Sequence, residues 1–214
     1  MFQKIFPQQV LFETGSPEDL CGELYPEEAA SIQKATKKRQ KEFTSTRLLA
    51  KKLLKQYHVD HFPILMGDHR EPLWPEHLCG TISHCPLLCA VAVAEKKHFR
   101  SLGCDIEIID RVDYKIHTHI CQDKEWDWIT LLPLEEQQKY FALIFSAKEC
   151  FFKWQFPLSH HWLNFKDTFI TIDVKNQQFT IQITASNFPH NETNLCATGQ
   201  FKFTDKLVLT GIAK

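Results

Sequence analysis

The spacing of apolar residues changes along the chain, and this change constrains the fold more than any other feature of the sequence. Residues 134–154 carry apolar side chains at helical spacing, which predicts a long amphipathic helix. The last fifty residues instead form short runs of β-branched and aromatic residues that alternate with polar ones, at 165–174, 178–186, 196–203 and 206–213. We therefore expect a long helix followed by an antiparallel sheet.

The first half of the chain also mixes helix and strand. Residues 26–57 are rich in good helix formers and contain no Gly or Pro after Pro26, which predicts one long helix or two short ones. Residues 62–80 are interrupted by Pro and Gly, so we expect a loop with a short strand there. Strands are predicted at 81–85, 87–96 and 101–109, and helical pieces at 113–132. This order predicts an α+β fold in two halves that meet near Leu102 or Gly103.

The composition narrows the classes of partner. The chain has 214 residues, 43% of them hydrophobic, which suffices for one large domain or two packed halves. Its 25 Lys and Arg balance 26 Asp and Glu, so no global charge attracts nucleic acid or anionic lipid. The first residues lack the apolar core of a secretory signal, and no stretch is long and apolar enough for a membrane span. We expect a soluble, cytoplasmic protein.

Cysteine and histidine pairs raise the alternative of a zinc site. Three pairs lie close in sequence: Cys85 and Cys89, His117 and His119, and His160 and His161. No second pair with zinc-knuckle spacing completes such a site. We expect the eight cysteines to be reduced thiols that pack as small hydrophobes, and the histidines to be surface or hydrogen-bonded interior residues.

Two acidic residues stand out in the predicted strand at 103–108. The period of two places Asp105 and Glu107 on one face and the apolar residues on the other. Like charges side by side repel each other, and a hard divalent cation with oxygen ligands would compensate them. A solvated strand face remains the alternative from these six residues alone.

The long helix adds a second charged group. At 100° per residue, Ser146, Glu149 and Lys153 lie together beside an apolar arc, so Glu149 and Lys153 are neighbours. The alternative reading of this pair is an ordinary surface ion pair. Lys148 falls inside the apolar arc, where it needs a carboxylate partner or an exposed end, so we expect it to support the site.

Ser83 and His84 end a predicted strand. Neighbouring residues of a strand point to opposite faces, so this pair does not form a nucleophile and base of the hydrolase kind. It better suits two groups that contact a bound phosphate, with a hydrogen-bonded histidine of no special function as the alternative.

Taken together, three motifs resemble the 4'-phosphopantetheinyl transferases. These are TISH at 81–84, LGCDIE at 102–107 and FSAKECFFK at 145–153, in that order and separation. They resemble the larger, single-chain type that activates siderophore and nonribosomal-peptide synthetases. The segment REPLWP at 70–75, with Gly80 after it, is similar to the enterobactin-synthetase subgroup. The resemblance covers residues 39–153.

The resemblance implies a fold and a metal site. It implies two similar-sized subdomains in a pseudo-twofold arrangement, residues 1–102 for coenzyme A and 103–214 for the metal and the carrier. Each would be an antiparallel sheet packed on a long helix, with the active site between them. Asp105, Glu107 and Glu149 match the acidic ligands that hold Mg²⁺ against the pyrophosphate of coenzyme A.

The resemblance also implies the groups that contact coenzyme A. Lys153, Ser83 and His84 match residues that contact its phosphates. The match for the 3'-phosphate is Arg47, with Arg39 as a helper. The adenine contacts would come from Arg70, Glu71 and Pro72. Glu71 stands where some relatives carry lysine, and Cys85 where many carry serine, so these nucleotide contacts depart from the family pattern.

The implied reaction moves the phosphopantetheine arm of coenzyme A onto a serine of an apo acyl or peptidyl carrier protein, for siderophore or other secondary-metabolite synthesis. Glu149 and Lys153 are the expected catalytic residues, with Glu149 accepting the serine proton directly or through a metal-bound water. We expect a monomer. Residues 111–129 either receive the carrier or form an ordinary buried helix face. The competing functions are a metal-dependent phosphodiesterase and a nucleotide-binding protein without chemistry.

Overall fold

The computed structural model describes residues 5–186, 188 and 196–214. The helices are α1 (Pro26–Ile32), α2 (Lys37–Gln56), α3 (His117–Ile120), α4 (Asp123–Thr130) and α5 (Leu134–Ser159). The strands are β1 (Leu11–Gly15), β2 (Leu78–His84), β3 (Cys89–Glu95), β4 (Leu102–Ile108), β5 (Thr168–Asp173), β6 (Gln178–Ile183), β7 (Cys196–Phe203) and β8 (Leu207–Ala213). This confirms the predicted α+β class.

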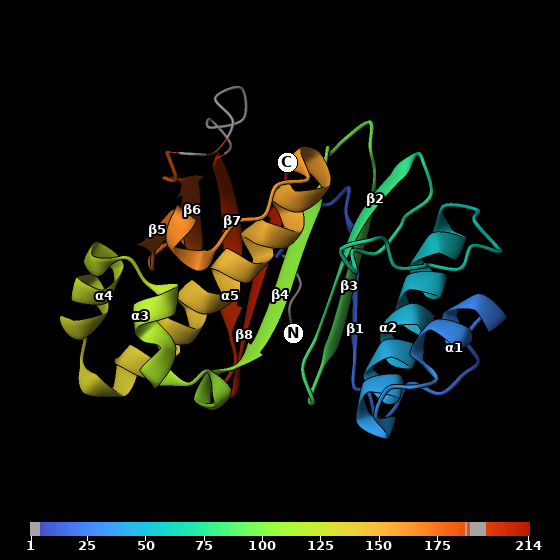
Figure 1. Cartoon of the computed structure of the whole chain (residues 1–214), viewed down its shortest axis with the longest axis horizontal. Coiled ribbons are helices and arrows are strands. Elements are labelled where there is room, and N and C mark those ends of the chain that lie inside the picture. The colour runs from blue at the N-terminus through green and yellow to red at the C-terminus, as the bar shows by residue number, and fades with distance from the viewer. Residues whose placement is uncertain (1–4, 187, 189–195) are drawn as a thin grey trace.

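The strands form two antiparallel sheets. The smaller sheet has the order β1-β3-β2 and the larger one β4-β8-β7-β6-β5. Helix α2 packs on β1 and β3, and α5 packs on β4 and β8. In Figure 1, α1 and α2 lie at one end of the molecule and α3 and α4 at the other, with β4 beside the smaller sheet. The pseudo-twofold relation and the boundary at residue 102 stay predictions.

Each long helix is positioned by its own apolar face. Thr36 caps α2, since its hydroxyl accepts the N–H of Arg39 at 3.3 Å, and Leu49, Leu53 and Leu54 pack on the smaller sheet. Helix α5 runs past the predicted end at residue 154 and includes Pro157 before it stops. Its buried aromatic side chains form the largest core, against the five-stranded sheet.

Two features of the fold were not predicted: strand β1, and the burial of both faces of β4. Strand β1 has only five residues, all of them half-buried, so it lacks the alternation that announces a strand. In β4 both faces are covered: the apolar residues pack against β8 and the smaller sheet, while α5 covers the acidic face. Gly103 permits this close approach, because a Cβ there would lie 2.2 Å from the carbonyl oxygen of Cys150.

The two sheets meet along β2 and β4 without a backbone ladder. Instead, the side-chain hydroxyls of β2 accept backbone N–H groups of β4: Thr81 Oγ1 from Cys104 at 3.1 Å, and Ser83 Oγ from Ile106 at 3.2 Å. We call this pair of contacts the hydroxyl seam. It satisfies the N–H groups on the edge of β4 that faces away from β8.

Candidate functional site

A cleft of about 770 Å³ lies between a loop, strand β2 and helix α5. Its walls include Arg70, Glu71, Pro72, Trp74, Gly80 and Thr81 on one side and Glu149, Phe152, Lys153 and Phe156 on the other. The cleft therefore brings the predicted adenine segment and the charged face of α5 together, although they are far apart in the sequence.

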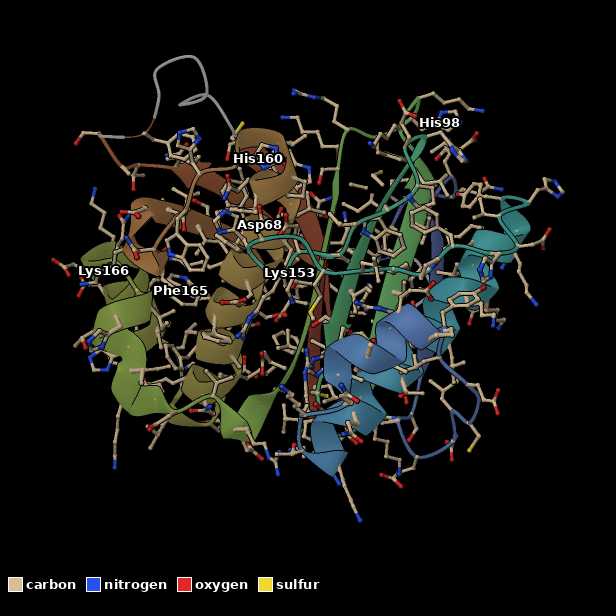
Figure 2. The ribbon with its side chains drawn as sticks, turned by 45° about the vertical axis from the view of Figure 1, so that its right-hand side comes forward. Asp68, His98, Lys153, His160, Phe165 and Lys166 are labelled. Atoms are coloured by element: carbon tan, nitrogen blue, oxygen red, sulfur yellow. The ribbon has the colours of Figure 1, made fainter. Side chains whose placement is uncertain are left out.

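The loop at residues 66–72 spans the distance to α5. Gly67 N–H donates to the Glu71 carbonyl at 2.8 Å, and the Glu71 carboxylate accepts the N–H of His69 at 2.9 Å. The His69 ring then packs edge-on against Phe156, with ring centroids 5.2 Å apart. Figure 2 shows the loop, marked by Asp68, extending toward the part of α5 that carries Lys153, with His160 just beyond the end of this helix.

Three of the predicted residues form one contact group. Lys153 Nζ donates to Asp105 Oδ1 at 2.6 Å and to Ser83 Oγ at 3.2 Å, and Ser83 Oγ lies 3.0 Å from the same Asp105 oxygen. Although burial works to lower the pKa of Lys153, Asp105 and Glu149 raise it well above its ordinary value. Lys153 is therefore a fixed positive charge at the cleft.

The other two predicted acids, Glu107 and Glu149, both have a raised pKa. Burial, followed by the negative charge of Asp105, raises the pKa of Glu107 to about 8. Burial also raises the pKa of Glu149, an effect that Lys153 opposes. Glu107 is therefore largely protonated at neutral pH, and Lys153 is the positive charge that faces Asp105 and Glu149.

The carboxylate oxygens of Asp105, Glu107 and Glu149 are the type of ligand that a hard divalent cation prefers. The second carboxylate oxygen of Asp105, Oδ2, is buried without a hydrogen-bond partner. Across residues 5–186, 188 and 196–214, however, no three His, Cys, Asp or Glu side chains are already arranged to hold a metal ion. Because Mg²⁺ prefers oxygen ligands from carboxylates, substrate phosphates and water, the carboxylates of this site fit the ion in their chemistry.

His84 lies in a different contact group from Ser83. Arg39 contacts His84 Nε2, and Glu42 lies 3.5 Å from His84 Nδ1. Burial, and then the positive charges of Arg39 and Lys153, lower the pKa of His84 to about 4, so it is neutral at pH 7. Neither His84 nor Arg39 is among the residues that line the cleft.

Arg47 is also away from the cleft wall. Its side chain is 6% exposed, its Nε donates to the Ile64 carbonyl at 3.0 Å, and Glu28 lies 3.8 Å away. Burial lowers the pKa of Arg47 to about 10, although the negative charge of Glu28 acts to raise this pKa. Glu28 also accepts the N–H of Ile64 at 2.9 Å, so this pair fixes the chain where the cleft loop begins.

A second cavity of about 530 Å³ adjoins the first. It shares Glu149 and Phe152 with the cleft, and its other lining residues are four apolar ones, Phe151, Trp162, Leu163 and Phe165, and six polar or charged ones. Figure 2 shows Phe165 and Lys166 across α5 from the loop that carries Asp68. Glu149 thus lies where the cleft and the second cavity adjoin.

The sequence interpretation missed several residues of the cleft. Lys96 and Arg100 add positive charge to its lining, and Trp74, Phe152 and Phe156 add aromatic walls. The basic run at 95–100 was the available signal for the first two. The local sequence does not identify the aromatic residues as part of a cleft, because aromatic side chains are common in any buried core.

The segment at 111–129 is packed inward only in part, since many of its residues are exposed. Tyr114, Trp126 and Trp128 are half-buried against the main core, and the His117 ring stacks on Trp126 with centroids 3.7 Å apart. Ile116 is exposed. This packing favours the buried-face interpretation for the aromatic residues, and the docking of a carrier there stays a prediction. Within the described ranges, no helix has the length and apolarity of a membrane span.

Comparison with known proteins adds an independent observation. The sequence profile of the 4'-phosphopantetheinyl transferase N-terminal domain matches residues 27–94, and that of the 4'-phosphopantetheinyl transferase superfamily matches residues 101–204. Over 171 residues the chain is 30% identical to the 4'-phosphopantetheinyl transferase Svp of Streptomyces mobaraensis, covering 79% of this chain and 70% of that protein.

Two further relatives show the range of the similarity. The 4'-phosphopantetheinyl transferase PptT of Mycobacterium tuberculosis is 33% identical over 156 residues, which are 72% of this chain and 68% of that protein. Enterobactin synthase component D of Salmonella typhimurium is 32% identical over 126 residues, 57% of this chain and 50% of that protein.

Proposed function

The chain belongs to the 4'-phosphopantetheinyl transferase superfamily, and on this premise we propose that it transfers the phosphopantetheine arm of coenzyme A to a serine of an apo-carrier protein. The observation that carries the proposal is the gathering of Asp105, Glu107, Glu149 and Lys153 beside a cleft lined by the predicted nucleotide segment.

The proposed reaction exchanges a phosphoanhydride bond of coenzyme A for a phosphate ester of the carrier serine. The carrier serine oxygen forms a bond to the β-phosphorus of coenzyme A, and the bond from that phosphorus to the bridging oxygen breaks. Adenosine 3',5'-bisphosphate leaves with the bond's electron pair, and the serine proton passes to a base. Positioning and neutralisation of the charge that develops on phosphate oxygens supply most of the catalysis.

Lys153 and Glu149 have distinct roles in this reaction. Lys153 keeps its positive charge and faces the cleft, so it stabilises the negative charge on the phosphate oxygens. Glu149 lines both cavities, and burial raises its pKa toward the range in which a carboxylate accepts a proton efficiently near neutral pH. We assign Glu149 as the base for the serine proton.

We propose that Asp105, Glu107 and Glu149 hold Mg²⁺. The buried, unpartnered Oδ2 of Asp105 and the raised pKa of Glu107 support this assignment. When bound, the cation would neutralise pyrophosphate charge and orient the β-phosphate. Lys153 already engages Oδ1 of Asp105, which leaves Oδ2 as the donor.

At the nucleotide end, we propose that Arg70, Glu71 and Pro72 contact adenine, because they form the cleft wall opposite α5. Arg39 is the candidate for the 3'-phosphate, since its side chain is 44% exposed and contacts His84. We propose that Arg47 acts through Glu28 and Ile64, which fix the start of the cleft loop.

The remaining proposals concern the carrier and the cell. The apolar side chains in the second cavity suit the uncharged part of the arm, because this cavity adjoins the cleft at Glu149 and Phe152. A siderophore or other secondary-metabolite pathway is supported by the match to enterobactin synthase component D. Six unpaired, buried cysteines support a reducing compartment, and we propose a cytoplasmic monomer.

The test is to incubate the protein with coenzyme A, Mg²⁺ and several apo-carrier proteins, and to measure intact carrier mass. We expect a gain equal to one phosphopantetheine group, lost with EDTA and restored by Mg²⁺. A carrier whose acceptor serine is replaced by alanine is the control. Unchanged mass for every carrier would contradict the transferase.

The same samples test the two competing functions. A phosphodiesterase would release adenosine bisphosphate from coenzyme A with no carrier present and leave the carrier mass unchanged. A binding protein without chemistry would bind coenzyme A and release nothing. Chromatography of the nucleotide products separates these outcomes.

A further inference from the structure

We infer that Gln122 is a positioning residue for one wall of the second cavity, and that it contributes to binding of the pantetheine arm of coenzyme A rather than of its nucleotide. This inference rests on the proposed function, because the assignment of the second cavity to the arm belongs to it. None of the sequence motifs includes Gln122, and its role follows from the hydrogen bonds that its side chain makes.

One wall of the second cavity is a single segment of the chain, residues 162–168. This segment connects α5 to β5 and contains one 3₁₀ turn, η3 (Phe165–Asp167). Figure 2 labels Phe165 and Lys166 on it. The residues that it contributes to the lining are Trp162, Leu163, Asn164, Phe165, Lys166 and Thr168. Because so short a turn makes few hydrogen bonds of its own, side chains from other elements must fix its position.

The side-chain amide of Gln122 holds this segment. Its nitrogen, Nε2, donates to the carbonyl oxygens of Lys166 at 2.9 Å and Thr168 at 3.0 Å, and it lies 2.7 Å from Thr184 Oγ1. An amide group has two hydrogens to donate, so these acceptors use its full capacity. Gln122 is not one of the described residues that line the cavity, so it acts on the wall and not on the arm directly.

Lys148 holds the same segment from α5. Its Nζ donates to the carbonyl oxygens of Phe165 at 2.9 Å and Thr168 at 3.1 Å. Lys148, however, lines the cavity itself and is paired with the buried Glu125, so its substitution would change the lining and leave a buried charge unpaired. Substitution of Gln122 does neither, so it changes the position of the wall without changing the residues that form it.

A wall that is held in place before binding reduces the cost of ordering it when the arm enters. Without the Gln122 amide, the carbonyl oxygens of Lys166 and Thr168 would each lose a donor, and the wall would have to be ordered on binding. The nucleotide does not share this cost, because no residue of 162–168 is among the described residues that line the cleft. Loss of the amide should therefore weaken binding of the arm alone.

Gln138 provides a matched control. It is also half-buried, and its Nε2 donates to two backbone carbonyls, those of Ile109 at 2.6 Å and Val112 at 2.8 Å. None of these three residues is among the described residues that line either cavity. Gln122→Met and Gln138→Met each remove an amide that bridges two carbonyls and keep a side chain of similar length.

Both substitutions of Gln122 keep its backbone N–H, which donates to Glu125 Oε2 at 2.7 Å. The second substitution, Gln122→Asn, keeps the amide on a side chain that is one methylene shorter and cannot reach both carbonyls. It replaces the methionine variant should that one unfold, and circular dichroism checks the fold of each variant.

Calorimetry on the intact chain with Mg²⁺ compares two ligands. One is coenzyme A, and the other is adenosine 3'-phosphate 5'-diphosphate, which is coenzyme A without its arm. We expect Gln122→Met to weaken the binding of coenzyme A about 3–10-fold and to leave the affinity for the nucleotide unchanged. Gln138→Met is expected to keep the ratio of the two affinities that the wild type has.

Three results would overturn the inference. The first is an equal loss of affinity for both ligands in folded Gln122→Met, which would indicate a general effect. The second is an unchanged affinity for coenzyme A in that variant. The third is the same selective loss in Gln138→Met. A wild type that binds no coenzyme A would contradict both this role and the transferase, whereas one that binds coenzyme A but modifies no carrier would contradict the transferase alone.

Discussion

Lys148 Nζ lies 2.7 Å from Glu125 Oε2, and neither side chain is more than 1% exposed. Lys148 also donates to the backbone carbonyls of Ile120, Phe165 and Thr168, so its ammonium group is fully bonded. The pair connects α5 to α4, and the carbonyl contacts connect α5 to the end of α3 and to the start of β5. Lys148 therefore has the carboxylate partner that a lysine in an apolar arc needs, and its support of the site stays a prediction.

We predict that Lys148→Ala lowers the free energy of unfolding by about 3–5 kcal/mol, because Glu125 would remain as an uncompensated buried charge. Denaturant unfolding followed by circular dichroism measures the change. Lys139→Ala is the control on the same helix, since Lys139 pairs with Glu136 at 3.2 Å on the surface. It should change stability by less than about 1 kcal/mol. Equal effects of the two substitutions would contradict the structural role of Lys148.

Glu149→Gln should reduce the maximal rate of transfer by about 10²–10⁴-fold, because the amide cannot accept the serine proton. The rate is measured by carrier mass at saturating coenzyme A and Mg²⁺, and far-ultraviolet circular dichroism checks the fold. Glu136→Gln, on the same helix but at its surface, should leave the rate unchanged. A rate near that of the wild type in folded Glu149→Gln would remove this residue from the mechanism.

Alanine substitutions of Arg39 and Arg47 should differ in how they change the preference for coenzyme A over its 3'-dephospho form. Arg39→Ala is expected to raise the KM for coenzyme A about 10-fold, the value of one charge-assisted hydrogen bond, and to leave the KM for 3'-dephospho-coenzyme A unchanged. Steady-state kinetics with both substrates measure the difference. An equal increase for both would argue against a contact between Arg39 and the 3'-phosphate.

Arg47→Ala serves as the comparison, because it leaves the carboxylate of Glu28 buried without its cation. We expect a loss of about 3–5 kcal/mol in unfolding free energy and no change in the preference for coenzyme A over its 3'-dephospho form. A selective loss of that preference in folded Arg47→Ala would assign the 3'-phosphate to Arg47 instead.

The cysteines should divide into two classes toward alkylating reagents at pH 8. Burial raises the pKa of Cys79 to about 11 and of Cys89 and Cys121 to about 12, so almost no reactive thiolate forms there. Cys21 and Cys196 are exposed. Peptide mass spectrometry after brief iodoacetamide treatment should find these two modified and the buried six protected until denaturant is added. Rapid modification of Cys89 in the native protein would contradict the packing of α2 on β3.

Most elements could be predicted from the sequence because their signals are local. The alternation in the last fifty residues predicted four strands, and four strands are present. The helix at 134–154 was found with its end misplaced, since Pro157 masked the final turn of α5. Strand β1 was missed because an edge strand of five half-buried residues carries no alternation.

The site was predicted less completely than the elements. The period of two correctly placed Asp105 and Glu107 on one face of β4, but their local pattern could not reveal that α5 covers this face. The sequence motif implies that Ser83 and Arg47 contact phosphates of coenzyme A, and these contacts stay predictions. The local sequence could not show that the Ser83 hydroxyl bonds to Asp105 or that Arg47 lies beside Glu28, because both contacts depend on how the elements pack.

The sequence by itself determined the helices, the strands and the identity of the charged residues, because spacing along the chain fixes which side chains share a face. Only the tertiary structure decided which of these charges meet: Lys148 with Glu125, and Lys153 with Asp105. These partners are 23 and 48 positions apart, so their pairing depends on how the elements pack. Burial then sets the strength of each pair, since a charge removed from water requires a partner that a surface charge does not.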